Sequence, residues 1–130
     1  MIVVDASAMI EALVGSAVDE DFLATLSDDV HAPHLLDVEV LSVLRGLLLG
    51  RRLTAERAEL ARLDFHDLGI ERHETSVLAD RIWSLRHQYT AYDAGYLALA
   101  EALGVPLFTC DAKLASGGHS ADVHLVGRSS

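Results

Sequence analysis

The stretch TAYDAGYLALAEALGVPLFTCDAKL (residues 90–114) predicts a helix, a turn and a strand, with an aspartate near the start of the helix and another just after the strand. Asp93 stands where the helical pattern begins, and the helix is apolar almost throughout until Gly104. A short strand over residues 105–109 then leads to Asp111. Because a helix start and a strand end can lie side by side in an α/β domain, we expect these carboxylates to meet. Clustered carboxylates need a positive partner, and the first candidate is a divalent metal ion.

The rest of the chain alternates short strands with helices. The β-branched residues 2–4 end on Asp5 and are typical of a buried parallel strand, and Ser7 is placed to cap the helix that follows. Alternation of this kind predicts an α/β fold with a mostly parallel sheet, whose ligands bind at the carboxyl ends of strands. Strands are expected at residues 2–4, 30–32, 68–71, 105–109 and 122–126, and helices at 8–14, 19–26, 35–50, 54–65, 74–87 and 93–103.

The helix at residues 35–50 is apolar nearly all round, so we expect it to be buried on most sides, with Asp37 as a possible cap. Along one side of this helix, the positions at helical spacing are not apolar, and they include Glu39 and Ser42. A lone glutamate on a buried helix is costly unless it is paired or binds a metal, which makes Glu39 a third candidate ligand. In the helix at 54–65, Leu60 and Leu63 are expected to face the core.

Four acidic residues share one property: each sits at the end of an element or on a buried face, where an unpaired carboxylate is expensive. Ligand sets made only of oxygen suit Mg²⁺ or Mn²⁺ better than zinc. We therefore expect a hard-cation site built from Asp5, Glu39, Asp93 and Asp111.

Composition sets the broad class. The 130 residues are 51% hydrophobic and are expected to form a single domain, 1–130, that buries a core without disulfides or a structural metal. No apolar run reaches the length of a membrane helix, and the start MIVVDASAM lacks the basic segment of a signal peptide, so we expect a cytoplasmic protein with no membrane contact. The single cysteine, Cys110, is expected to be a small buried side chain.

The net charge of −10 disfavours a protein that coats nucleic acid, because such proteins are usually basic. It is compatible with a metal-dependent hydrolase, since bound cations reverse the local charge. The seven histidines show no H-E-x-x-H or Cys/His spacing, so we expect them to be ordinary surface or core side chains.

Three segments resemble PIN domains, and specifically the VapC-type toxins of bacterial toxin–antitoxin pairs: VVDASAM (3–9), LLDVEVLSVLR (35–45) and, most specifically, residues 90–114. The resemblance covers essentially the whole chain. It implies a three-layer α/β/α sandwich with a short central sheet. It also implies a Mg²⁺- or Mn²⁺-dependent endoribonuclease that hydrolyses RNA, often tRNA or rRNA, with a metal-activated water. A VapB-type antitoxin would be its partner, and a homodimer its usual assembly.

The resemblance also assigns residues. The four acids match the catalytic, metal-binding pocket of the family, with Asp5 and Asp93 as the principal ligands. Ser7 and Thr109 match its accompanying hydroxyls, and Ser42 stands where many relatives carry asparagine. Substrate RNA could contact a basic cluster or one separate lysine, although the cluster could equally be a solvated helix end. These basic residues are Arg45, Arg51, Arg52, Arg57 and Lys113.

Two rival functions stay open. A receiver-like signalling domain is also a small doubly wound fold with an acidic Mg²⁺ pocket. It would want adjacent acids after the first strand and a lysine after a late strand, whereas Asp5 is single and alanine follows Asp111. The other rival is a PIN scaffold that binds partners without catalysis.

Overall fold

The structure, a computed structural model, describes residues 1–129. Its centre is a five-stranded sheet in the order β3-β2-β1-β4-β5, in which every neighbouring pair is parallel. The first strand of the chain is therefore the middle of the sheet. The predicted short, mostly parallel sheet is confirmed. The strands are β1 (Ile2–Val4), β2 (Val30–Pro33), β3 (Ile70–His73), β4 (Leu107–Thr109) and β5 (Val123–Leu125).

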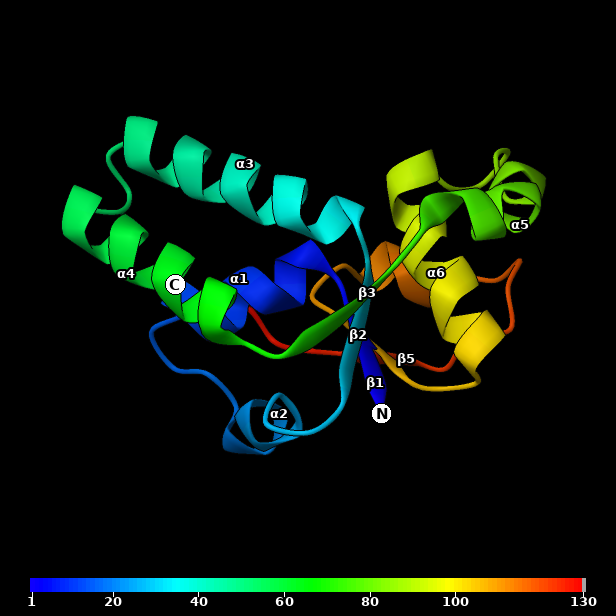
Figure 1. The fold of residues 1–130 in the computed structure, drawn as a ribbon, viewed down its shortest axis with the longest axis horizontal. Helices are drawn as coiled ribbons and strands as arrows, with labels where there is room; N and C mark the ends of the chain where they lie inside the picture. Colours follow the sequence, from blue (N-terminus) through cyan, green and yellow to red (C-terminus); the bar gives the residue numbers. More distant parts are fainter. Residues whose placement is uncertain (130) are drawn as a thin grey trace.

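Helices cover both faces of the sheet. Figure 1 shows α1, α3 and α4 on one side and α5 and α6 on the other, which confirms the expected α/β/α sandwich. No helix among residues 1–129 is long and apolar enough to cross a membrane. The helices are α1 (Ala6–Val14), α2 (Glu20–Thr25), α3 (Leu35–Leu49), α4 (Ala55–Asp67), α5 (Ala79–Ser84) and α6 (Ala91–Leu103), with 3₁₀ turns η1 (Thr75–Leu78) and η2 (Ala112–Ala115).

Local signals set the bounds of α6. At its start, the Thr90 hydroxyl accepts a hydrogen bond from the backbone N–H of Asp93 at 3.2 Å. At its end, Gly104 adopts a left-handed backbone with φ of 67°, and its N–H donates back to Ala100 and Glu101. The cap and the turn therefore place Asp93 in the first helical turn, close to the positive end of the helix dipole.

Two caps differ from expectation. The first helix begins at Ala6 rather than Ala8, and its cap is Asp5, whose carboxylate accepts from the N–H of Ala8 at 3.0 Å. Ser7 therefore lies inside the helix. Asp37 does not cap α3 either, because both of its oxygens accept from the guanidinium of Arg72, at 2.7 and 2.8 Å.

The prediction that α3 is buried on most sides is wrong. Its buried residues are Leu36, Val40 and Leu44, whereas Val38 and Leu49 are 71% and 63% exposed. The reason is visible in Figure 1: α3 and α4 lie side by side and extend beyond the sheet, so only one face of each is covered.

The burial expected for α4 is also wrong. Leu60 and Leu63 are exposed, and the helix packs through Ala61 and Phe65 instead. The apolar positions at 60 and 63 belong to a face of α4 that no other element among residues 1–129 covers.

Residues 74–87 form η1 followed by α5, rather than one helix. Thr75, Ser76 and Val77 are poor helix formers and make a 3₁₀ turn. At the other end, the Ser84 hydroxyl donates to the carbonyl of Arg81 at 2.6 Å, a local bond that competes with helix continuation.

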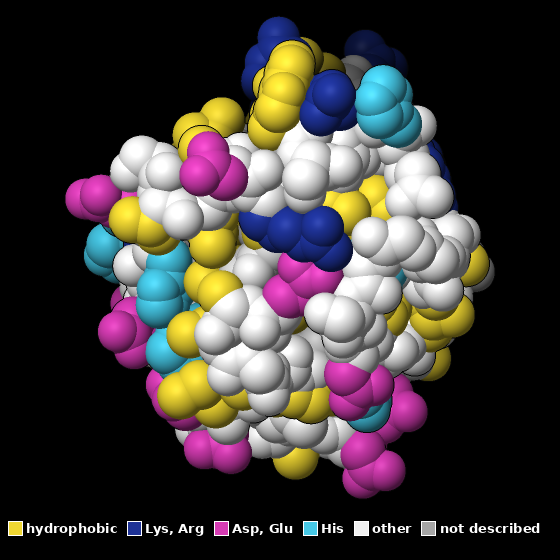
Figure 2. All heavy atoms as spheres, turned by 90° about the vertical axis from the view of Figure 1, so that its right-hand side faces the viewer, with side chains coloured by type: hydrophobic (Ala, Val, Ile, Leu, Met, Phe, Trp, Pro, Cys, Tyr) yellow, Lys and Arg dark blue, Asp and Glu magenta, His cyan; other side chains and the backbone are white. Residues whose placement is uncertain are grey.

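The α5–α6 side of the molecule carries an ion pair. Figure 2 shows this side, with a basic patch directly above an acidic one near its centre. The Arg81 guanidinium on α5 donates to both oxygens of Glu101 on α6, at 2.8 and 2.9 Å. This pairing, together with hydrogen bonds from Ser120, lowers the pKa of Glu101 to about 2. The pair holds α5 against α6.

Candidate active site

Asp5 is the most firmly held of the four acids. It follows β1 directly and is 5% exposed. One carboxylate oxygen accepts from the Ser7 hydroxyl at 2.7 Å and from the N–H of Ala8 at 3.0 Å, and the other accepts from the Thr109 hydroxyl at 2.5 Å. Three donors on two elements therefore fix its orientation.

The same hydroxyls join the ends of β1 and β4. Thr109 is fully buried, and its oxygen accepts from the N–H of Asp111 at 3.0 Å. Ser7 in turn accepts from the N–H of Cys110 at 2.9 Å. From the sequence, Ser7 could be a helix cap or a residue that orients a ligand. In the structure Ser7 is not the cap, and its hydroxyl donates a hydrogen bond to the Asp5 carboxylate.

Glu39 reaches the site from α3 and has a partner that the sequence analysis missed. The hydroxyl of Tyr96, which is almost fully buried on α6, donates to Glu39 Oε1 at 2.6 Å. Burial and the nearby Glu39 carboxylate raise the pKa of Tyr96, so the phenol stays a donor. The signal was present, because Tyr96 stands three residues after Asp93 on the same helical face.

All four acids line one cavity with a volume of about 280 Å³. Asp93 enters it from the first turn of α6. Asp111 enters from the end of β4, where its carboxylate also accepts from the N–H of Lys113 at 3.0 Å. The meeting of Asp93 and Asp111 expected from residues 90–114 is therefore observed.

The cavity disfavours negative charge. Burial is the main cause that raises the pKa of Asp5, Glu39 and Asp93, and repulsion within the cluster adds to it. None of the ion pairs among residues 1–129 includes any of the four acids. The cluster thus offers several carboxylate oxygens without an ion-pair partner, and such a donor set fits Mg²⁺ or Mn²⁺.

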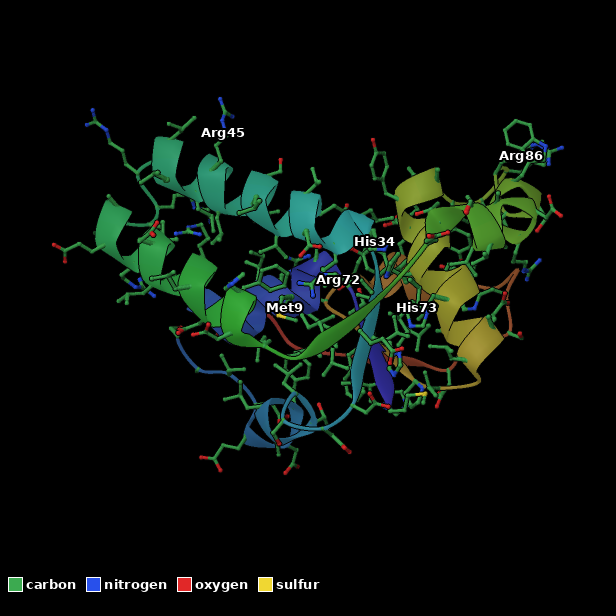
Figure 3. The ribbon with its side chains drawn as sticks, viewed as in Figure 1. Met9, His34, Arg45, Arg72, His73 and Arg86 are labelled. Carbon is green, nitrogen blue, oxygen red and sulfur yellow. The ribbon has the colours of Figure 1, made fainter. Side chains whose placement is uncertain are left out.

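The predicted basic cluster is spread out. Figure 3 shows Arg45 pointing away from the sheet, on the outer side of α3. Arg51 is exposed in the turn after α3, with φ of 57°. Arg52 lines a second cavity, of about 310 Å³, which shares Ser7 and Ile10 with the acidic one.

Two other predicted positions do not line the acidic cavity. Lys113 is exposed, and its charge lowers the pKa of Asp93 against the larger effect of burial. Ser42 is exposed and lines a shallow hollow with Glu39 and Tyr92, outside the acidic cavity.

The sequence analysis assigned no role to the residues after the last expected strand and missed their place at the site. Arg128 lines both the acidic cavity and the neighbouring one. Its position is set by Glu11, a buried carboxylate on α1 that accepts from the backbone N–H of Ser129 at 2.9 Å and from the Ser129 hydroxyl. A single acid in the otherwise apolar helix ASAMIEALV was the available signal.

The fold and this cavity define a class of protein. The sequence profile of the PIN domain family matches residues 2–118, and the chain belongs to that family. Within it, the chain groups with VapC proteins. It is 37% identical to Ribonuclease VapC12 of Mycobacterium tuberculosis, over 97% of this chain and 99% of the relative. It is 40% identical to Ribonuclease VapC9 of the same organism, over 92% and 93% of the two chains, respectively.

Solved structures agree on the fold. The structure titled PAE2754 from Pyrobaculum aerophilum matches with a TM-score of 0.67 at 21% identity, over 93% of this chain and 87% of the other. Mycobacterium tuberculosis VapC20, titled a sarcin–ricin loop cleaving toxin, matches with a TM-score of 0.64 at 18% identity, over 92% and 97%. At these identities the likeness concerns the fold alone.

Proposed function

We propose that this chain is a Mg²⁺- or Mn²⁺-dependent endoribonuclease and the toxin of a toxin–antitoxin pair. The observation that carries the proposal is the cavity in which four carboxylates meet without an ion-pair partner. It occurs in a chain that is 37–41% identical to curated VapC ribonucleases over nearly its whole length.

The proposed catalytic residues are the four acids that line the cavity. Asp5 and Asp93 are the principal ligands, and Glu39 and Asp111 complete the oxygen set. When bound, a divalent ion supplies a Lewis acid beside the phosphate and activates water. The Thr109 hydroxyl donates to the Asp5 carboxylate and so fixes its orientation for metal binding.

Three cations at the rim are proposed to bind RNA phosphates. Arg52 and Arg128 border the second cavity, and Lys113 lies beyond Asp111. These cations would position the RNA backbone at the acidic cavity. Because the chain has a net charge of −10, they would not give it a general affinity for nucleic acid.

The proposed substrate is structured RNA, such as tRNA or rRNA, and the proposed partner is a VapB-type antitoxin. Two solved structures of similar fold, each 16% identical to this chain, are FitAcB from Neisseria gonorrhoeae and FitAB bound to a DNA fragment. We further propose that residues 1–130 act as one domain, as a homodimer and in the cytoplasm.

The test is cleavage of total RNA by the purified protein with Mg²⁺ or Mn²⁺, followed by mapping of new 5′ ends. Asp5→Ala should reduce site-specific cleavage by about a hundredfold or more, since even partners of metal ligands cost about 10–100-fold. Asp28→Ala, on an exposed acid outside the cavity, is the matched control and should cut normally.

Failure of the wild-type protein to cut RNA under these conditions would favour the scaffold or the receiver-like alternative. Equal cutting by Asp5→Ala and wild type would refute the assignment of the site. A small open reading frame directly upstream that encodes a DNA-binding protein would support the toxin over the receiver-like domain.

A further inference from the structure

A second cluster of potential metal ligands lies at the β2–β3 edge of the sheet, outside the acidic cavity. His31, Glu71 and His73 each offer one ligand atom, and these atoms all lie within 4.8 Å of one another. His31 Nδ1 is 2.8 Å from His73 Nε2 and 3.6 Å from Glu71 Oε2. None of the three residues lines the acidic cavity.

The strand register explains why these residues meet. β2 and β3 are parallel, with His31 opposite Glu71 and Pro33 opposite His73. His73 is thus the diagonal neighbour of His31 on the same face of the sheet. β3 is the edge strand, so the cluster is open on one side while His31 itself is 3% exposed. Figure 2 shows a column of histidine side chains bordered by acidic ones along one edge of the molecule.

The far side of the His31 ring gives an independent indication. Its Nε2 lies 3.0 Å from the Asp29 carboxylate, yet it is the one buried side-chain nitrogen or oxygen among residues 1–129 without an aligned hydrogen bond. The Asp29 carboxylate therefore faces one nitrogen of the His31 ring, while the other nitrogen, Nδ1, faces His73 and Glu71. Carboxylate–histidine pairs of this kind orient the ligands of metal sites.

The donor set selects the ion. Two imidazole nitrogens and one carboxylate oxygen suit zinc, whereas the all-oxygen cavity suits Mg²⁺ or Mn²⁺. Zinc ligands lie about 2.0–2.2 Å from the ion, so neighbouring ligand atoms of a tetrahedral site are about 3.3–3.6 Å apart. The 3.6 Å separation of His31 Nδ1 from Glu71 lies at the upper end of that range, whereas the 2.8 Å separation from His73 is shorter, so the partly exposed His73 side chain would have to move outward.

We propose that His31, Glu71 and His73 bind Zn²⁺, with the fourth position open to water, and that the ion joins edge strand β3 to β2. Asp29 acts as a positioning residue through the His31 ring. The site is independent of the proposed nuclease activity, because its residues belong to a different part of the sheet.

The experiment measures zinc binding to the full chain after removal of metals with a chelator. The Asp93→Asn variant serves as the background, so that the acidic cavity contributes less. Equilibrium dialysis should give one Zn²⁺ per chain, and Co²⁺ as a spectroscopic substitute should show the visible absorption of a four-coordinate nitrogen and oxygen site.

His73→Gln and Glu71→Gln should each weaken zinc binding at least tenfold, because each removes a direct ligand. Both side chains are at least partly exposed, so the variants should fold, as checked by circular dichroism. His124→Gln is the matched control: His124 also contacts an aspartate at 3.0 Å on an edge strand, but at the opposite edge of the sheet. It should bind zinc as the background does.

Asp29→Asn should keep one site per chain, weaken it about 10–100-fold and alter the Co²⁺ spectrum. Unchanged affinity and spectrum would refute the positioning role. Zinc binding that is equal in His73→Gln and in the background, or absent from the background at micromolar zinc, would overturn the proposal.

Discussion

Thr109→Val tests whether the Thr109 hydroxyl, which donates to Asp5, stabilises the site. Valine matches threonine in shape but removes the donor to Asp5 and the acceptor for the N–H of Asp111. A hydrogen bond to a charged group is worth about 1.5–3 kcal/mol, and a buried N–H without a partner costs about 1–3 kcal/mol. Thr109 and Asp5 are buried, so solvent screening gives little relief.

We therefore expect the free energy of unfolding to fall by about 3 kcal/mol. For a domain of this size that corresponds to a decrease in Tm of about 12 °C. The Thr109 hydroxyl lowers the pKa of Asp5, so its loss raises that pKa further. A group whose folded pKa is raised loses stability as pH rises through that pKa, so the deficit of Thr109→Val should be larger at pH 8 than at pH 5.

The assay is thermal unfolding at several pH values, with and without Mg²⁺. Thr25→Val is the matched control, because the Thr25 hydroxyl donates only to a carbonyl within its own helix, and a change within about 0.5 kcal/mol is expected. A Thr109→Val protein with the wild-type Tm and the wild-type response to Mg²⁺ would show that Asp5 does not depend on this hydroxyl.

The charged side chains of the cavity and of the α6 surface give three further expectations. Asp93→Asn removes a charge that burial disfavours, so it should raise the Tm of the metal-free protein while abolishing RNA cleavage; a lower Tm would contradict the reasoning. In the metal-free wild type, the raised pKa values of Asp5, Glu39 and Asp93 mean that the folded state binds extra protons. Stability should therefore fall as the pH rises above the ordinary carboxyl range, and Mg²⁺ should flatten this slope; a flat metal-free profile would argue against it. Arg81→Met should cost about 1 kcal/mol at pH 7, since the arginine is partly exposed. Because the folded pKa of Glu101 is depressed, this loss should vanish as pH falls towards 2, and a constant deficit in acid would contradict it.

The parts of the fold that sequence predicted well have local causes. Gly104 ends α6 through a left-handed turn, which its residue type predicts. The alternation of strands and helices was enough for a parallel sheet, and the ends of its strands placed Asp5 and Asp111 at one edge.

The parts that sequence missed depend on distant partners. Apolar character on α3 and α4 could not show that Val38 and Leu60 lack a covering element. Asp5 and Ser7 both suit a helix cap; the structure makes Asp5 the cap, and the Ser7 hydroxyl donates to the Asp5 carboxylate. His31 and His73 come together through the register of two strands separated by two helices, which no spacing motif records.

The central position of β1 has a consequence for the order of synthesis. β1 leaves the ribosome first, yet one of its two neighbours in the sheet, β4, is the fourth of the five strands to be made. Asp5 has no donor at its second oxygen until Thr109 arrives, and Arg128 reaches the cavity rim only near the end of the chain. A partly synthesised chain therefore lacks a complete cavity, so truncated products would carry no assembled site.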